Sequence, residues 1–275
     1  MTTPPVNPPV AIGVAPDAPP EPDAYDWPAL VDGLNRYLRL KATPVGMKLF
    51  DTVADMEAIE RIRRPDRKHA LDQIVAQARW LNRTVGITMD DLTGPQCGAP
   101  VGLYPQEPAW RKSTNMSGVW FATDADAIAH QEAMDCLPAG RYHALAVSPL
   151  ATGRLNPPDI ALLYATPGQM IILINALQFS GYKKLEFSCV GESACADSWG
   201  RALRTGEPSL SIPCFAERRF GGVQDDELLM AIPPRYLPKV IDGLAALNRN
   251  GLRYPIASLG IEADPAESLA RSYAR

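Results

Sequence analysis

Residues 159–181, DIALLYATPGQMIILINALQFSG, decide the fold of this chain. From Asp159 to Ala165 the segment is almost continuously apolar and has the length of a buried strand. Pro167 then opens a helix that Gly181 ends, since proline suits the first turn of a helix and glycine its end. A buried strand that runs directly into a helix indicates a sheet with helices packed on it.

Strands and helices alternate on both sides of this segment as well. Capping residues mark the helix boundaries; Asp26, for example, is placed to cap the helix that begins at Trp27. Strands are predicted at 45–50, 142–148, 185–189, 209–214 and 228–232, and helices at 27–40, 55–62, 69–83, 124–136, 195–203, 238–248 and 264–274. Phe220–Gly222 is expected to form a sharp turn. The alternation predicts an α/β, or mixed α+β, fold: one mixed sheet covered by helices.

The domain organisation follows from composition. Residues 1–26 are proline-rich and lack a periodic apolar face, so we expect an extended arm. Residues 27–258 show no change in composition that would divide them, which predicts a single globular domain. Residues 259–275 are expected to form a peripheral C-terminal segment. An arm of this kind could lie across a second copy of the chain, so a homodimer is a hypothesis.

Charge and hydropathy exclude two classes of partner. The 275 residues carry a net charge of −4, and the longest basic cluster is RIRRPDRK at 61–68, so we expect no nucleic-acid binding. Polar residues interrupt the apolar run 160–177, so this segment is not predicted to span a membrane. The N-terminal residues lack the pattern of a signal peptide, so a cytoplasmic protein is expected.

The five cysteines are the first candidate site. Their odd number and the absence of a secretion signal argue against a disulfide framework. Cys97, Cys189, Cys195 and Cys214 are candidate ligands, since thiolates select zinc, copper(I) or iron–sulfur clusters. Buried core thiols are the alternative, because free cysteine is among the most buried residue types. Cys136, on a predicted helix, is expected to be structural.

The second candidate site is the segment ERRFGG at 217–222 with the acids that follow it. Paired arginines can grip a carboxylate or phosphate, so Arg218 and Arg219 are candidate catalytic residues that orient an anion. A diglycine allows close approach of backbone to ligand, which makes Gly221 and Gly222, with Asp226, candidate substrate-binding residues. The alternative is a turn with solvated charges.

The second half of the chain also resembles a known family. The segments that carry the resemblance are RYHALAVSPL, PDIALLYATPGQMIILINAL, GEPSLSIPCFAERRFGGVQDDELLMAIP and GLRYPI, with TPVGMKLF and QCGAPVGL earlier in the chain. These segments and their order resemble those of the family called domain of unknown function 169. The resemblance covers roughly residues 28–256. Relatives often have cysteines matching Cys97, Cys195 and Cys214, which implies a shared cofactor site. They also often have a cysteine near the start of the helix KHALDQIVAQARW, where this chain has Asp72, Gln73 and His69 instead.

The leading functional hypothesis is an enzyme with a cysteine-bound iron–sulfur cluster of the 4Fe–4S type, or another metal such as zinc, acting on a small anionic organic molecule. Lyase or hydratase chemistry is favoured over redox chemistry, because an iron with an open position acts as a Lewis acid. The alternative is a cofactor-free ligand-binding or sensory module with structural cysteines. A third hypothesis is a reactive thiol at Cys195.

Overall fold

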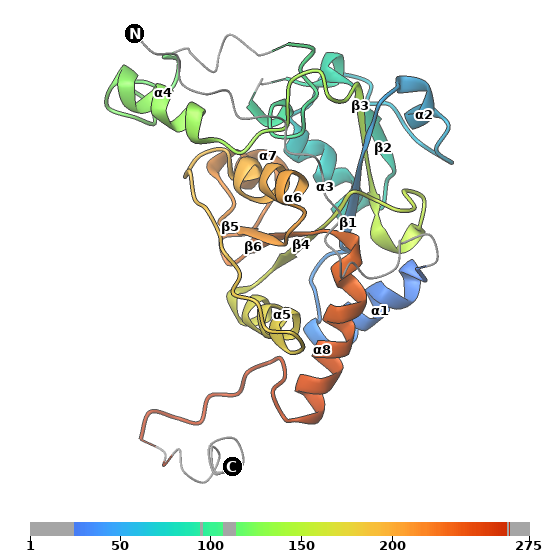
Figure 1. Cartoon of the computed structure of the whole chain (residues 1–275), viewed down its shortest axis with the longest axis vertical. Helices are drawn as coiled ribbons and strands as arrows, with labels where there is room; N and C mark the ends of the chain where they lie inside the picture. The colour runs from blue at the N-terminus through green and yellow to red at the C-terminus, as the bar shows by residue number, and fades with distance from the viewer. Residues whose placement is uncertain (1–24, 94–95, 107–113, 263, 265–275) are drawn as a thin grey trace.

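The computed structural model describes residues 25–93, 96–106, 114–262 and 264, and a six-stranded sheet lies at its centre (Figure 1). The strand order is β2-β3-β1-β4-β6-β5, and all five pairings are antiparallel. The strands are β1 (Val45–Phe50), β2 (Val85–Ile87), β3 (Ala144–Pro149), β4 (Ile160–Ala165), β5 (Ser209–Ser211) and β6 (Leu228–Ile232).

The mixed α+β fold is confirmed, and helices cover both faces of the sheet. The predicted mixture of parallel and antiparallel pairs is wrong in detail, because the named strands pair only antiparallel. Strand direction depends on where each connection crosses the sheet. An alternation of strands and helices along the chain does not determine those crossings.

One face of the sheet packs against three helices through apolar contacts. These helices are α1 (Trp27–Leu38), α5 (Pro167–Gln178) and α8 (Leu237–Arg249). Along β4 and β6, Leu163 and Met230 point into this layer. Gly243 lets α8 approach α5 closely, since a Cβ at this position would lie 2.3 Å from the carbonyl oxygen of Ala176. We call this layer the α5/α8 face.

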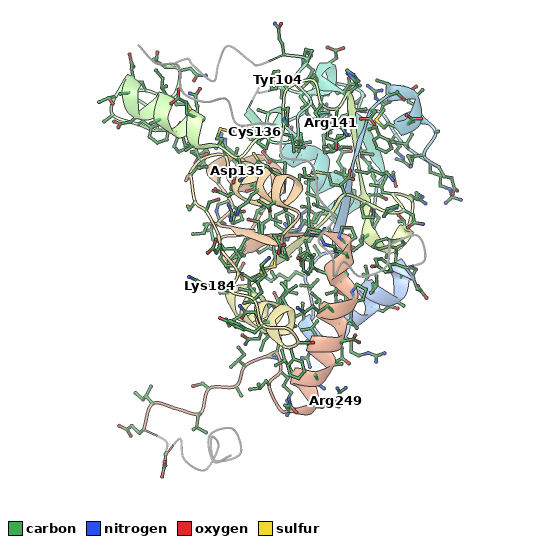
Figure 2. The ribbon with its side chains drawn as sticks, in the orientation of Figure 1. Tyr104, Asp135, Cys136, Arg141, Lys184 and Arg249 are labelled. Atoms are coloured by element: carbon green, nitrogen blue, oxygen red, sulfur yellow. The ribbon has the colours of Figure 1, made fainter. Side chains whose placement is uncertain are left out.

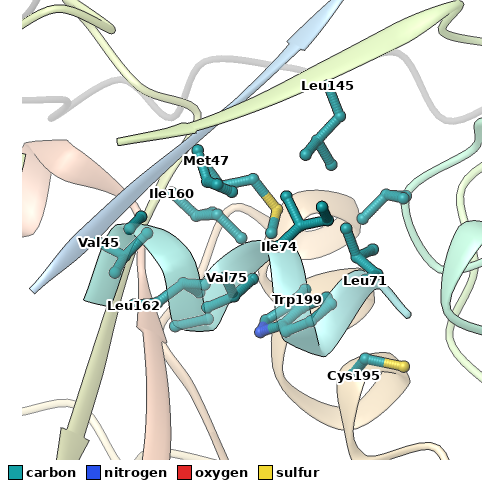
Figure 3. Close-up of a cluster of buried hydrophobic side chains, with 14 of the residues drawn as sticks. Val45, Met47, Leu71, Ile74, Val75, Leu145, Ile160, Leu162, Cys195 and Trp199 are labelled. Atoms are coloured by element: carbon teal, nitrogen blue, oxygen red, sulfur yellow. The ribbon is translucent and has the colours of Figure 1, made fainter. Parts of the chain in front are cut away.

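The opposite face packs against α3 (Leu71–Leu81), α6 (Arg201–Thr205) and α7 (Phe215–Gly221), with a π-helical turn at Ala196–Gly200. We call it the α3/α7 face. Figure 3 shows Met47 and Ile160 from the strands meeting Ile74 of α3 and Trp199 of the π turn. Cys195 lies at the border of this apolar cluster, and its sulfur points away from it (Figure 3). Two further helices remain: α2 (Val53–Glu57) packs its buried Met56 against Phe50, Ala144 and Ala146 of the sheet, and α4 (Asp124–Ala133) lies outside both layers.

Local sequence explains where the principal helices begin. Asp26 accepts a hydrogen bond from the Ala29 amide and caps α1, as predicted. Thr166 and Gln169 form a capping box at the start of α5, with Pro167 in the first turn. The Gln169 amide also donates to the carbonyls of Leu38 and Arg39, which ties α5 to the end of α1.

Several predicted boundaries were wrong. No strand forms at 185–189, β5 ends at Ser211, and the predicted turn at 220–222 is the end of α7. Gly222 stops that helix in the left-handed conformation, with φ of +65°. The short strand β2 was not predicted, since three residues, Val85–Ile87, give too short a pattern to recognise.

The predicted arm and C-terminal helix lie almost wholly outside the described residues, so the arm, the peripheral segment and the homodimer stay predictions. Among the described helices, none combines the length and apolar character needed to cross a bilayer.

Candidate functional site

Three cysteines from three separate segments meet on the α3/α7 face. Cys97 lies in the short 3-10 turn Gln96–Gly98, Cys195 directly precedes the π turn, and Cys214 is the N-cap of α7. The thiols of Cys97 and Cys195 are hydrogen-bonded to each other, and Cys214 is close enough to act electrostatically on Cys195. Cys195 and Cys214 are buried. The structure therefore brings together the three cysteines that the resemblance singled out.

Asp72, on the first turn of α3, joins these cysteines. Its Oδ2 lies 3.9 Å from the Sγ of Cys97, and its side chain is buried. Burial raises the pKa of Asp72 to about 6. Its Oδ1 has no hydrogen-bond partner among the described residues. A buried carboxylate oxygen without a partner is costly, which makes this atom a candidate ligand.

Glu217 adds a second buried carboxyl group to the centre. It lies one turn after Cys214 on α7, and its Oε2 accepts a hydrogen bond of 3.2 Å from the Cys214 amide. Its Oε1 lies 3.5 Å from the hydroxyl of Tyr164, on β4. Burial, followed by the negative charge of Asp72, raises the pKa of Glu217 to about 8. This carboxyl group therefore holds a proton in a large part of the molecules at neutral pH.

Arg79 is the one buried cation beside these acids in the described part of the chain. It lies two turns after Asp72 on the same face of α3 and forms an ion pair with Glu227, both side chains being almost fully buried. Its guanidinium carbon lies 4.1 Å from the ring centre of Tyr164 and 4.5 Å from that of Trp80. Its Nε and Nη1 have no hydrogen-bond partner among the described residues.

The thiols are protonated in the absence of a cation. Burial raises the pKa of Cys214 to about 12. The hydrogen bond with Cys97 and burial raise the pKa of Cys195 well above its usual range. The hydrogen bond from Cys195 lowers the pKa of Cys97, but burial and the acids Asp72 and Glu217 outweigh it, so this pKa is raised as well. An activated thiolate requires a lowered pKa, so the reactive-thiol hypothesis for Cys195 lacks support.

The donor set fits a thiolate-bound cofactor in its chemistry. Three sulfurs and one carboxylate match the preference of zinc and of iron–sulfur clusters for thiolate. Among the described residues, however, no group of three or more histidine, cysteine, aspartate or glutamate side chains is arranged to hold a metal ion. Cys97 and Cys195 contact each other instead, so a bound cofactor would require these thiols to separate.

The other two cysteines lie apart from this group. Cys189 is exposed, and it is not among the groups that act on the three thiols. Its ligand role stays a prediction. Cys136 is half-buried in the connection after α4, next to Asp135 (Figure 2). Asp135 is bound there by Arg204 of α6, at 2.6 Å, which fixes this connection on the molecule.

The predicted arginine pair has mostly local contacts. Arg218 donates to the carbonyls of Pro213 and Gln224, so it holds the loop that follows α7. Arg219 lies 6.0 Å from the ring centre of Phe215. Asp226 is exposed and pairs with Lys41 at 3.0 Å. The catalytic and substrate-binding roles of these residues therefore stay predictions without a geometric argument in their favour.

The diglycine has a more informative position. A Cβ at Gly221 would lie 3.2 Å from the Cβ of Asp72, so this glycine allows α7 to pack tightly on α3 beside the buried acids. Gly221 and Gly222 also line a surface hollow of about 660 Å³. The predicted role of both glycines next to a ligand is therefore consistent with their location.

Comparison with known proteins places this chain in a family. The sequence profile of domain of unknown function 169 (DUF169), described as an uncharacterised ArCR family, matches residues 33–243. The chain belongs to the DUF169 family. The DUF169 match runs from α1 into α8 and includes Asp72 and all five cysteines.

An archaeal relative of this DUF169 chain is itself uncharacterised. The uncharacterised protein MJ0308 of Methanocaldococcus jannaschii is 21% identical over 185 residues, which cover 65% of this chain and 76% of that protein. No solved structure matches the chain.

Sequence reasoning missed most of the polar residues around the cysteines. It did not single out Arg79 or Tyr164. It also did not predict that Asp72 lies beside Cys97, or that Glu217 and Glu227, among the acids of the second candidate site, are buried. A signal was present in α3, where Asp72 and Arg79 interrupt the apolar face formed by Leu71, Ile74, Val75 and Ala78. Charged residues on the apolar side of an amphipathic helix indicate a buried polar site.

Proposed function

We propose that this chain is an enzyme whose buried centre binds an iron–sulfur cluster through Cys97, Cys195, Cys214 and Asp72. The observation that supports the proposal most is the meeting of these four side chains from four separate segments, with the Asp72 Oδ1 left without a partner. Asp72 would supply the fourth ligand near the place where relatives often have a cysteine. Zinc held by the same four side chains is the alternative metal.

The balance of charge supports a cation at this centre. Within the described chain, the acidic groups outnumber the basic ones around the cysteines, with three carboxyl groups and three thiols against the guanidinium of Arg79. Burying so many acids is unfavourable unless they stay protonated or meet positive charge. Metal binding would release the thiol protons and replace them with that charge.

The chemistry proposed for the cofactor is non-redox. A cluster held by three thiolates and one carboxylate would offer one iron with an exchangeable ligand, which can act as a Lewis acid in hydration, dehydration or lyase reactions. Asp72 would be the exchangeable ligand, because carboxylate binds iron less tightly than thiolate does. The substrate would be a small anionic organic molecule that reaches the centre from the side of Gly221.

The test is metal and sulfide analysis of protein purified without oxygen. We expect roughly four irons and four sulfides per chain and a broad absorption band near about 400 nm. Cys97→Ser, Cys195→Ser and Cys214→Ser should each lose most of the iron, whereas Asp72→Cys should keep it with an altered spectrum. Cys189→Ser and Cys136→Ser are the matched controls and should retain iron. Colourless protein without iron or zinc would contradict the proposal.

A second candidate, a cofactor-free ligand-binding or sensory module, is favoured by the hydrogen bond between the thiols of Cys97 and Cys195. In that case the cysteines only pack. Each serine variant would then lower the free energy of unfolding by a graded amount, with the largest loss at the most buried position, and no variant would change the metal content.

A further inference from the structure

A basic groove lies on the solvent side of the contact between α3 and α7. It is lined by residues 63–67, by the outer side of α3, and by Phe220–Gly222 at the end of α7. Its volume of about 660 Å³ falls within the ~300–1,000 Å³ typical of small-molecule pockets. We call this hollow the basic groove.

Arginines dominate the charge of the groove. Arg63, Arg64, Arg67 and Arg83 line it, and Asp66 is its one acidic lining residue. Arg64 is held by Asp91 at 2.5 Å and by Glu57 at 3.1 Å. The other three arginines form no ion pair with any described carboxylate. Arg83 donates to the side-chain oxygen of Gln77 at 3.3 Å. A chain of net charge −4 therefore concentrates in one hollow three guanidinium groups that no described carboxylate neutralises.

The fold fixes two of these arginines beside each other. The Arg63 amide donates to the carbonyl of Thr84 at 3.0 Å, and the Arg63 carbonyl accepts from the Gly86 amide at 2.9 Å. This parallel bridge attaches residue 63 to the start of β2, next to Arg83. Because the backbone is held at both positions, little ordering is needed when a ligand binds, which favours affinity.

The groove also offers aromatic surface. Trp80 and Phe220 line it and are 42% and 48% exposed, and Gln73 and Gln77 add amide groups. Exposed large aromatic side chains in a concave site suit a planar ring, which can stack on them. Guanidinium groups recognise phosphate oxygens through paired hydrogen bonds. The two features together match a phosphate ester that carries a planar ring.

A second hollow continues the positive charge. It has a volume of about 450 Å³, is lined by Arg61 and Arg154, and shares Arg63 and Arg83 with the basic groove. Arg63 and Arg83 thus line both hollows. This arrangement suits a ligand with two phosphates rather than one, because phosphate oxygens could be bound from both hollows.

We propose that the basic groove binds a nucleoside diphosphate, with its phosphates on Arg63 and Arg83 and its base against Trp80. The inference goes beyond the proposed cofactor centre and does not rest on it. The two sites are neighbours nevertheless, since Gly221 lines the groove and packs against Asp72.

The test is calorimetric titration of the full chain with adenosine diphosphate, followed by pyrophosphate, adenosine and a single-stranded oligonucleotide. We expect adenosine diphosphate to bind at least about tenfold more tightly than pyrophosphate or adenosine alone, because both the arginines and the aromatic surface then contribute. The double variant R63Q/R83Q should weaken its binding at least about tenfold, and Trp80→Leu several-fold.

Arg249→Gln is the matched charge control, because Arg249 is exposed at the end of α8, remote from α3 and α7 (Figure 2). It should bind adenosine diphosphate as the unaltered protein does. Equal affinity of R63Q/R83Q and Arg249→Gln would overturn the proposal, and so would tighter binding of the oligonucleotide than of the diphosphate. Repeating the titration with Cys195→Ser separates the two sites. Unchanged affinity of this variant for adenosine diphosphate supports binding in the groove, even where the metal analysis contradicts the proposed cofactor centre.

Discussion

The two faces of the sheet are built from different kinds of side chain. On the α5/α8 face the buried side chains are mostly apolar, and the buried polar ones are hydrogen-bonded: Gln169 to the end of α1, and Ser148 to Thr84. The α3/α7 face buries Asp72, Arg79, Glu217 and Glu227 among its apolar residues. Buried charge costs stability unless it is paired, so its concentration on one face marks the α3/α7 layer, and not the α5/α8 layer, as the candidate functional one.

The largest effect should come from breaking the one buried ion pair of the α3/α7 face. Glu227→Leu leaves Arg79 buried without its carboxylate and should lower the free energy of unfolding by about 4 kcal/mol. The double variant R79M/E227L should recover most of that loss, because it removes both charges together. Urea unfolding of the single and double variants measures these changes in the free energy of unfolding. A double variant as unstable as the sum of the single losses would show that the pair has further essential partners.

The next effect tests the close packing of the α5/α8 face. Gly243→Ala places a methyl group against the carbonyl oxygen of Ala176 and should cost about 3 kcal/mol, because a backbone atom cannot move aside as a side chain can. Asn248→Ala, at an exposed position of the same helix, is the control and should stay close to the unaltered protein. Equal stability of both variants would mean that α5 and α8 are less tightly packed than described.

A smaller effect of opposite sign should come from Asp72. In protein stripped of metal by a chelator, Asp72→Asn should raise the free energy of unfolding by about 1 kcal/mol, because it removes a buried charge whose Oδ1 has no partner. The measurement is urea unfolding in the chelator. A loss of stability instead would place Asp72 with the structural residues and weaken the distinction between the two faces.

The smallest effect concerns Asp159, which precedes β4 and accepts a 2.6 Å hydrogen bond from the Leu49 amide. Burial raises the pKa of Asp159, so the folded protein holds this proton at pH values where the unfolded chain has lost it. Stability due to this group should therefore fall as the pH rises from the ordinary carboxyl pKa of about 3.9 to the raised value. Asp159→Asn should lack that decline. Unfolding free energies of both proteins across this pH range give the comparison, and a gain in stability of the unaltered protein relative to Asp159→Asn as the pH rises would contradict the sign.

Much of the fold followed from local patterns, and much of the centre did not. Residues 159–181 formed the strand and helix that their apolar run and Pro167 indicated, although the helix ends at Gln178, before the predicted end at Gly181. The antiparallel order of the strands depends on long connections, which local patterns do not encode. Cys97, Cys195 and Cys214 could be grouped in advance only through the resemblance. Their meeting with Asp72 and Glu217 depends on how α3 packs against α7 at Gly221.

The strand order also dictates when the chain can complete its fold. β1 lies between β3 and β4, both of which come far later in the sequence. During synthesis, the first strand therefore has no neighbour to pair with until β3, in the middle of the chain, has emerged, and pairing over such a separation is slow. The segment with Cys214 follows all of these strands. The cysteine centre is thus among the last parts of the molecule to assemble, and any cofactor must enter a chain that is already largely folded.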